Sequence, residues 1–316
     1  MIYQNIPNNL FIPQWGMVVR GGLPDTQCPI NTLFNNGEQG VFYVPQPVVD
    51  GQQVLFTDVA GETPVTADGD PVGLMLDLSG NGNHAIQSAS LSRPTYRTSP
   101  DRIRLDGAND NLLIDFGGEF TGEVFQGTPR GIIHMEVSTS DGSWALTENP
   151  RHVPDSGEIT GIVAVEGSVD PASEQAIEAY LRTRGAGADF SGITDMTGWF
   201  RRRTDITKIY SNNWDTSNVT SFFRFATGCF NLANVTVSGG AGNPFADSPC
   251  TNYTSAFAGT NLTQQSIDDI LVAIELAGTS NGVFDQSGGS APSAVGETAI
   301  DALRSRGWAM NVTGGY

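Results

Sequence analysis

A segment that nearly repeats itself after 26 residues constrains how the C-terminal half of this chain can fold. The octapeptide beginning at Ile193 (ITDMTGWF) returns at Val219 as VTSFFRFA. Apolar residues recur in the same register: Ile193 with Val219, Met196 with Phe222, Ile206 with Leu232, and Ile209 with Val235. Units this short cannot bury an apolar face alone, so each is expected to add one layer to a shared core. An architecture of this kind offers binding surfaces more often than catalytic pockets.

Composition limits the classes of partner. The 316 residues predict two domains. Sixteen Lys and Arg against 34 Asp and Glu give a net charge of −18, which repels nucleic-acid phosphates and anionic lipid headgroups. No apolar run reaches the roughly 18 residues of a membrane span, and the N-terminus has no basic region typical of a signal peptide. We therefore expect neither nucleic acid binding nor membrane insertion.

The three cysteines, Cys28, Cys229 and Cys250, show no CxxC spacing, which excludes a zinc ribbon. Cys229 and Cys250 could bridge adjacent layers of the repeat or remain separate. Because nothing else in the chain indicates a disulfide-stabilised scaffold, buried free thiols are favoured.

Residues 1–40 form a predicted arm that mixes apolar side chains with Pro, Asn and Gly in no regular period. Such a segment is expected to order on another surface, either its own domain or a neighbouring subunit, and the neighbour is favoured. The candidate docking residues are Tyr3, Leu10, Phe11, Ile12 and Trp15.

Residues 41–188 predict an antiparallel β-sandwich of the jelly-roll or lectin-like type, because short apolar runs alternate with Gly- and Asn-rich turns. A helix closes this domain. Asp170 and Pro171 form its N-cap and first turn, and Gly185 stops it. The expected strands occupy 41–44, 54–56, 73–77, 102–105, 111–115, 131–137, 143–146 and 161–165.

Residues 189–316 predict a short leucine-rich-repeat-like solenoid with capping helices, so the whole chain is expected to be mainly β with some α. The repeats span about 190–262. Ser266 and Asp269 resemble a capping box that opens a helix ending near Gly278. A Gly- and Ser-rich loop at 281–296 then leads to a short helix around Ile300 and a terminal strand at 308–312.

Three stretches carry a resemblance to known families. Residues 56–85 together with Ser92-Arg-Pro-Thr-Tyr resemble a module recurrent in tailed-phage and prophage virion proteins. Within it Asp77-Leu-Ser-Gly-Asn-Gly-Asn-His, and beyond it Leu105-Asp-Gly-Ala-Asn-Asp, are similar to elements of concanavalin-A-like lectin and glucanase sandwiches. Residues 193–235 resemble BspA-like repeats, relatives of leucine-rich repeats, and residues 261–312 are similar to the segment that comes after such repeats in phage fibre proteins.

The resemblance departs from those families in three places. The lectin-like region is shorter than usual, and only two repeats are well formed, with a divergent third at Tyr253. Residues 1–35 match nothing in them.

The resemblance implies a non-enzymatic virion structural protein, most simply a tail fibre or tail-tip adhesin that contacts a glycan or protein of the host cell surface. It further implies contact with other virion proteins, a homotrimer, assembly in the host cytoplasm and a place on the tail or capsid exterior. A head fibre or capsid decoration protein is the first alternative, and a carbohydrate-active enzyme is the second.

The candidate receptor contacts lie in the repeat region. Positions 196 and 222, like 199 and 225, recur in register and are predicted core. Tyr210 and Trp214 fall in the connection between repeats and are predicted to be exposed. Arg201, Arg202 and Arg203 form the densest basic run, predicted to be a solvated or intersubunit salt-bridging edge.

Catalytic and metal sites are weakly indicated. His134 and Glu136 share a strand face, and Glu119 and Glu123 flank a predicted glycine turn, but neither pair has the partner motif of a glycosidase. Catalysis is therefore not predicted.

Asp77, Asn81 and Asn83 have a spacing compatible with Ca²⁺. Turns in which these side chains bond their own backbone are favoured, so no cofactor is predicted.

Overall fold

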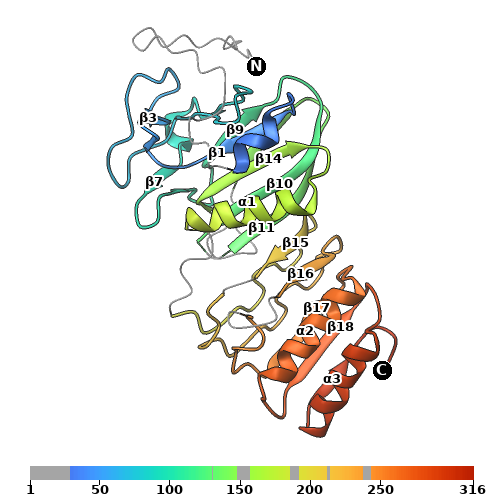
Figure 1. Cartoon of the computed structure of the whole chain (residues 1–316). Helices are drawn as coiled ribbons and strands as arrows, with labels where there is room; N and C mark the ends of the chain where they lie inside the picture. The colour runs from blue at the N-terminus through green and yellow to red at the C-terminus, as the bar shows by residue number, and fades with distance from the viewer. Residues whose placement is uncertain (1–28, 130, 148–156, 186–191, 212–213, 238–242) are drawn as a thin grey trace.

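The computed structural model describes residues 29–129, 131–147, 157–185, 192–211, 214–237 and 243–316. Within these residues the protein is mainly β, with several sheets, three α-helices and two short 3₁₀ helices, η1 (Pro29–Phe34) and η2 (Ser90–Ser92). The molecule is elongated, and its N-terminal half lies above the repeat region (Figure 1).

A six-stranded sheet joins the two halves. It runs antiparallel from its first strand to its fifth, and the fifth and sixth strands are parallel. Strand β15 lies beyond the predicted domain boundary at residue 188, yet it pairs directly with β11. Hydrogen bonding therefore continues across that boundary. The order is β1 (Gly40–Tyr43), β14 (Gly161–Glu166), β10 (Phe120–Thr128), β11 (Gly131–Thr139), β15 (Ile206–Tyr210) and β16 (Asn234–Thr236).

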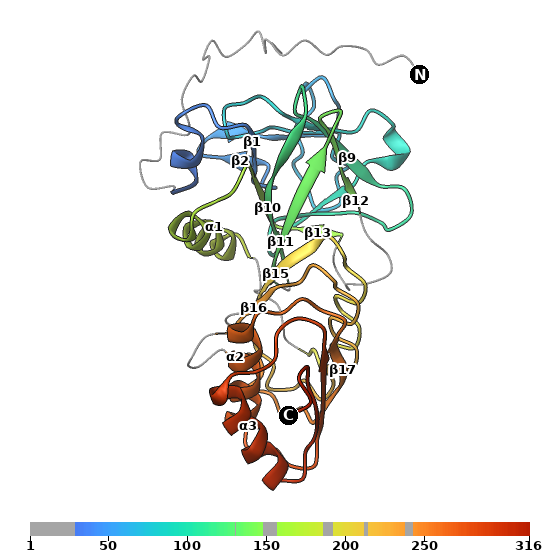
Figure 2. The same cartoon turned by 90° about the vertical axis from the view of Figure 1, so that its right-hand side faces the viewer.

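The five-stranded sheet lies on one side of the six-stranded sheet, and helix α1 (Pro171–Thr183) lies on the other (Figure 2). Buried side chains from all of these layers belong to one hydrophobic cluster. The five-stranded sheet is β12 (Ser143–Thr147), β9 (Asn111–Asp115), β6 (Ala85–Ile86), β5 (Leu74–Met75) and β4 (Leu55–Phe56). The others are β13 (Glu158–Ile159) with β8 (Arg102–Arg104) and β7 (Thr95–Arg97), and β2 (Val48–Val49) with β3 (Gln52–Gln53).

Strand β10 was not predicted, although it is central to the large sheet. The glycine turn expected between Glu119 and Glu123 is wrong, because Gly122 lies inside this strand. A Cβ at Gly122 would stand 2.1 Å from the carbonyl oxygen of Val165 on β14, so the close approach of the two backbones requires glycine. Because glycine occupies an inward position of β10, the strand lacks the apolar pattern by which the other strands were predicted.

Helix α1 has the predicted ends. The Asp170 side chain accepts hydrogen bonds from the backbone N–H groups of Ala172 and Ser173 at 2.9 and 3.1 Å. Its buried side chains are Ile177, Tyr180 and Leu181.

The 26-residue register is confirmed by parallel pairing. Ile209 on β15 lies opposite Val235 on β16, and a parallel bridge joins Asp195 to Ser221. A further bridge joins Ser221 to Asn252, at the start of β17 (Asn252–Ala258), so the divergent third copy joins the same stack. Strands β17, β18 (Val283–Ser287) and β19 (Ala309–Asn311) continue in parallel.

The aromatic side chains predicted to fill the core of the repeat region are buried. Trp199 is 2% exposed, and Phe222 and Phe225 are fully buried. The Phe222 ring stacks on that of Tyr253 in the next layer, with 5.1 Å between centroids. Successive layers therefore share one core.

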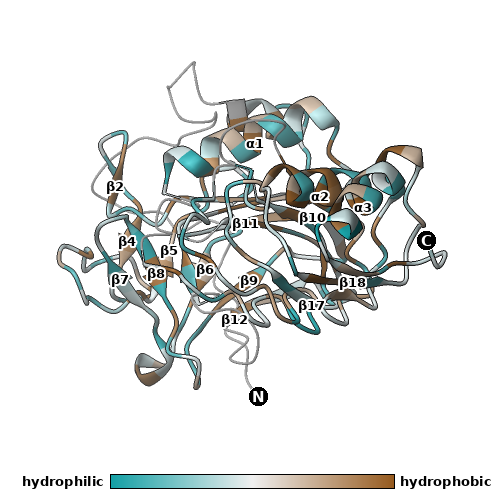
Figure 3. Ribbon diagram, turned by 90° about the horizontal axis from the view of Figure 1, so that it is seen from below, coloured by the Kyte–Doolittle hydropathy of each residue, from teal (hydrophilic) through white to brown (hydrophobic). Residues whose placement is uncertain are grey.

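Two predictions in the C-terminal region are wrong in detail. Helix α2 (Gln264–Leu276) begins after Thr263, whose side chain accepts from the Ser266 N–H, so Ser266 is not the cap. The Ser266 hydroxyl instead accepts from the Val235 N–H at 2.9 Å, which attaches the helix to β16. The loop predicted at 281–296 contains β18. Helix α3 (Ala294–Ser305) and β19 agree with prediction. All three helices line one side of the molecule (Figure 3).

Cys229 and Cys250 are free and buried, as predicted. Burial raises the pKa of Cys229 to about 12 and that of Cys250 to about 11. Both thiols are therefore protonated at neutral pH.

Trp214 packs where the two halves meet. Its ring centroid lies 6.2 Å from those of Trp199 and Phe225 in the first two layers. The space beside Gly131, at the start of β11, is also filled by its indole, which a Cβ at Gly131 would meet at 2.9 Å. One side chain thus contacts the large sheet and two repeat layers.

We expect Trp214→Ala to lower the free energy of unfolding by about 3–5 kcal/mol, because it leaves a cavity at this junction. Since both halves share one sheet, urea unfolding followed by far-UV circular dichroism should stay a single transition at lower midpoint. Phe230→Ala, at a side chain that is 65% exposed, is the control and should change little. Unfolding of the repeat layers alone, with the N-terminal half still folded, would contradict the prediction.

Candidate functional site

The predicted calcium ligands form a structural turn. Buried Asp77 accepts at Oδ1 from the backbone N–H groups of Phe42 and Ser79, both at 2.9 Å. Its Oδ2 accepts from the Ser79 hydroxyl at 2.7 Å and the Asn83 N–H at 3.1 Å. Burial raises the pKa of Asp77, and these hydrogen bonds lower it in part. Both carboxylate oxygens are engaged by donors of the protein itself.

Asn81 and Asn83 complete the same turn. Their side-chain amides donate to the carbonyl oxygen of Gly40, at 3.2 and 3.1 Å. The turn therefore covers the free edge of β1 and satisfies its backbone. Across the described ranges, no group of three or more His, Cys, Asp or Glu residues is placed to hold a metal ion.

A polar cluster lies between α1 and the six-stranded sheet. His134 Nε2 is 3.2 Å from the Glu123 carboxylate, and its Nδ1 is 3.3 Å from the Thr207 hydroxyl on β15. The Phe125 ring stacks on the imidazole, with 4.5 Å between centroids. His134 thus pairs with Glu123 across the strands, whereas Glu136, its predicted neighbour, is exposed.

Glu174 of α1 extends this cluster. Its carboxylate accepts from the Lys208 ammonium and the Tyr210 hydroxyl, both on β15. The desolvation that would raise the pKa of Glu174 is outweighed by these two hydrogen bonds, so its pKa is lowered. Burial is the main cause that raises the pKa of Tyr210. The cluster attaches α1 to β15.

Protonation of His134 should weaken this junction. Burial lowers the pKa of His134 below 6.5, although Glu123 and Glu174 act against it, and Lys208 lowers it further. The unfolded chain then binds more protons than the folded one, so stability falls as pH drops below about 6.5.

In His134→Gln, the free energy of urea unfolding should fall less between about pH 7 and pH 5 than in the wild type. His84, whose pKa burial also lowers, is present in both proteins. Parallel pH profiles would contradict this account.

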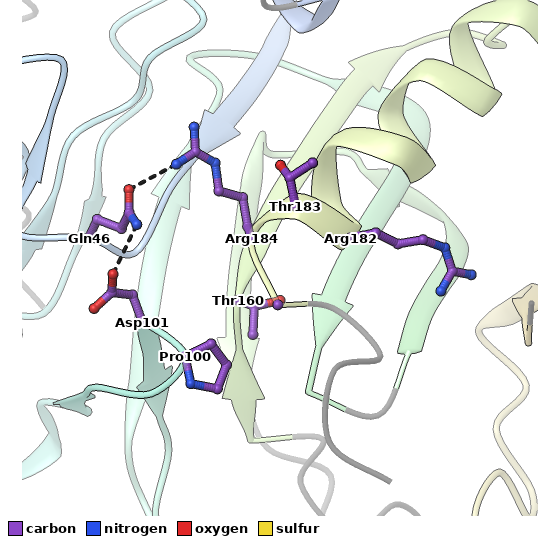
Figure 4. A pocket seen from close by; sticks show the side chains of 8 residues that line it. Gln46, Pro100, Asp101, Thr160, Arg182, Thr183 and Arg184 are labelled. Atoms are coloured by element: carbon purple, nitrogen blue, oxygen red, sulfur yellow. Dashed lines mark hydrogen bonds between the residues drawn. The ribbon is translucent and has the colours of Figure 1, made fainter. Parts of the chain in front are cut away.

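A pocket of about 390 Å³ lies beside the C-terminal end of α1 (Figure 4). Gln46 donates to Asp101 at 2.9 Å and accepts from Arg184 at 3.0 Å. Arg182 pairs with Glu178 at 2.8 Å. Gln46, Asp101 and Arg184 thus bond one another, whereas the buried Thr160 hydroxyl has no hydrogen-bond partner among the described residues. Its lining is Gln46, Pro100, Asp101, Thr160, Arg182, Thr183, Arg184 and Gly185.

The prediction that Tyr210 and Trp214 are exposed is wrong, because each is 1% exposed. Tyr210 lies on β15 beneath α1, and Trp214 fills the junction described above. Arg203 is also buried, at 6% exposure, and its Nε donates to Asp205 at 2.7 Å. It shares its layer position with buried Cys229, which explains why it differs from its neighbours.

The other two arginines of that run do lie at the surface. Arg202 is exposed and Arg201 half-exposed, and the structure adds three neighbours in the following layer. Arg224 is exposed, with its guanidinium 4.8 Å from the centroid of the half-buried Phe223 ring. Phe230 is 65% exposed. We call this surface the arginine–aromatic face, defined by Arg201, Arg202, Phe223, Arg224 and Phe230.

Backbone contacts place the members of this face in adjacent layers. The N–H of Gly198 donates to the Phe223 carbonyl at 2.9 Å, and that of Arg202 to the Thr227 carbonyl at 2.8 Å. A Cβ at Gly228 would lie 3.4 Å from Arg202 Cγ, and one at Gly259 would lie 3.4 Å from the Phe230 ring. The face is on the side of β17, away from α2 and α3 (Figure 2).

The repeat register held a signal for the missed residues. Phe223 stands at the position of Thr197, which is exposed, so its ring points away from the core. Arg224 stands at the position of Gly198. Both assignments follow from the 26-residue spacing once each layer position is classed as inward or outward.

Two arginines of the face adopt left-handed backbone conformations. Arg202 has φ +60° and Arg224 has φ +54°. At the layer position of Arg202 stand Gly228 and Gly259, and at that of Arg224 stands Gly198 in the first layer, with φ between +67° and +76° for the three glycines. The third layer has Ser255 at the position of Arg224, with φ +54°. Left-handed backbone costs a non-glycine residue about 1–2 kcal/mol. The left-handed backbone conformation therefore does not explain why these two residues are arginines.

Glycine should replace each arginine without loss of stability. For Arg202→Gly and Arg224→Gly we expect a free energy of unfolding within about 1 kcal/mol of wild type, since relieved strain offsets the entropy of glycine and the lost cation–π contact. Gly228→Ala, the matched control, should lower it by about 1 kcal/mol or more. Urea denaturation measures both, and losses above about 2 kcal/mol in the glycine variants would assign the arginines a structural role.

The predicted docking residues Tyr3, Leu10, Phe11, Ile12 and Trp15 lie outside the described residues. Among the helices that the structure describes, none is long and apolar enough to cross a bilayer. Comparison with protein-family models, curated proteins and solved structures finds no match to the chain.

Proposed function

We propose that this chain is a non-enzymatic virion structural protein, a tail fibre or tail-tip adhesin that contacts the host cell surface. In this proposal the N-terminal half is a lectin-like sandwich, and the repeat region is a leucine-rich-type solenoid capped by α2, α3 and β19. The motif resemblance to phage virion modules and BspA-like repeats supplies the biological setting.

The observation that carries the proposal is the sheet shared by the two halves. Pairing of β11 with β15 makes one continuous body, with η1 and β1 towards one end and α3 at the other (Figure 1). The arginine–aromatic face belongs to the half remote from β1. A body of this form can be held at one end while the other end meets a second surface, which is what an adhesin requires.

Attachment to the particle falls to the predicted N-terminal arm in this proposal, through contacts with other virion proteins. Its last part packs on this chain instead, because Pro29–Phe34 form η1 and Ile30 is fully buried in the hydrophobic cluster. A homotrimer would multiply weak contacts with a glycan or protein of the host, because linked sites raise the effective concentration of one another. Its place is the exterior of the virion after assembly in the host cytoplasm.

The strand geometry is a further support. Glu123 and Glu136 lie directly opposite each other on neighbouring strands of one sheet, and Glu123 is engaged by His134. Glycosidases hold their two carboxylates on either side of the scissile bond, across a cleft. The two glutamates here lie on one face of a single sheet, and the Glu123 carboxylate pairs with His134.

Immunogold electron microscopy tests the location. Antibodies against residues 243–316, applied to purified virions of the phage that encodes the chain, should label the tail tip. Labelling of the capsid would support a head fibre or decoration protein instead, and unlabelled particles would overturn a virion role. Sugar release from host polysaccharide that is lost in Glu136→Gln would overturn the non-enzymatic part.

A further inference from the structure

The arginine–aromatic face carries strain that the fold does not need. Arg202 holds a left-handed conformation where the next two layers have Gly228 and Gly259, and Arg224 holds one where the first layer has Gly198 and the third has Ser255. Non-glycine residues kept in such conformations are concentrated at functional sites, where the side chain serves a purpose that offsets the strain. The presence of arginine at these two positions is therefore explained by its side chain and not by the backbone conformation.

These side chains are also uncompensated in charge. No carboxylate of the described residues lies within salt-bridge distance of Arg201, Arg202 or Arg224, whereas Arg203, Lys208 and Arg306 each have one. Residues 192–263 contain five basic and four acidic residues, a net charge of +1, in a chain whose net charge is −18. The face is thus a local positive surface on an acidic protein, and it attracts anions at short range.

The aromatic residues of the face indicate that its ligand has apolar surfaces as well as negative charge. The Phe230 ring is 65% exposed, and the Phe223 ring is half-buried beneath the Arg224 guanidinium. An exposed phenyl ring packs against apolar C–H surfaces, and a guanidinium binds carboxylate through two parallel hydrogen bonds. Sugars that carry carboxylates offer both surfaces within one unit.

We infer that the arginine–aromatic face binds an acidic, carboxylate-bearing polysaccharide, with Arg202 and Arg224 on the carboxylates and Phe230 against a sugar ring. This inference rests on the proposed function, since it names the class of host-surface ligand. A guanidinium also pairs with phosphate, so binding of a nucleic acid is an outcome that the test distinguishes.

The test uses the full chain with fluorescently labelled polygalacturonate, alginate and hyaluronate, measured by anisotropy. The neutral control is methyl-esterified polygalacturonate, and the non-sugar controls are polyphosphate and single-stranded poly(dT). Wild type should bind at least one acidic polysaccharide and should not bind the neutral form, and its affinity should fall as salt rises.

The variants locate the site. The double variant Arg202→Gly, Arg224→Gly should bind about tenfold more weakly or worse. Glycine is the replacement because it adopts the left-handed backbone of both positions without strain. Phe230→Ala should also weaken binding to the polysaccharide while leaving weak binding to polyphosphate unchanged. Arg304→Ala, which removes an exposed arginine on α3, is the matched control and should bind as wild type does. Circular dichroism of each variant confirms its fold.

Three results would overturn the inference. They are binding to none of the acidic polysaccharides, undiminished binding by the double variant, and equal or tighter binding to polyphosphate or poly(dT). The last would identify a general polyanion surface or a nucleic-acid site. None of these results alters where antibodies label the virion, so failure of this inference and failure of the proposed function are distinguishable.

Discussion

The pairing of β11 with β15 is the constraint on which the rest of the structure depends. It places Ile132 opposite Tyr210 and Ile133 opposite Ile209, so β15 of the first repeat layer is also a strand of the six-stranded sheet. β16 pairs with β15 in parallel, and the parallel bridges from Asp195 to Ser221 and from Ser221 to Asn252 place β17 in the same stack. Because the pairing buries Tyr210 beneath α1, the helix, the sheet and the repeats form a single hydrophobic cluster. The orientation of the repeat region is therefore set by hydrogen bonds rather than by a linker.

How far the sequence could predict this fold depended on whether the signal was local. The repeat register, the Asp170 cap of α1 and the inward positions of Met196 and Phe222 follow from spacing alone, and the structure confirms them. Strand β10 could not be recognised, because glycine is required at position 122 by the close approach of the Val165 carbonyl. That carbonyl belongs to a partner strand and lies 43 residues away in the sequence. The predicted exposure of Tyr210 and Trp214 was wrong for the same reason. Tyr210 is buried by its contact with α1, and Trp214 by its contact with Gly131, and both partners are distant in the sequence.

Polar motifs that suggest ligand binding serve the backbone in this protein. Asp77 satisfies two N–H groups of its own turn and that of Phe42, and the amides of Asn81 and Asn83 satisfy the Gly40 carbonyl. A carboxylate used in this way stabilises an edge strand whose groups would otherwise lack partners. The spacing of such a motif therefore describes a turn, and only the surrounding contacts distinguish it from a cation site.

The arginine–aromatic face is informative for the opposite reason, because it departs from what its layer positions require. In a stack of layers, most positions are decided by the neighbouring layer: an apolar ring inward, a glycine where the backbone is left-handed. Arg202 and Arg224 stand where glycine would suffice, and neither has an acidic partner among the described residues. Backbone geometry accounts for neither side chain. We therefore attribute the two arginines to a ligand outside the chain. A guanidinium beside an exposed ring fits an anion that also has apolar faces.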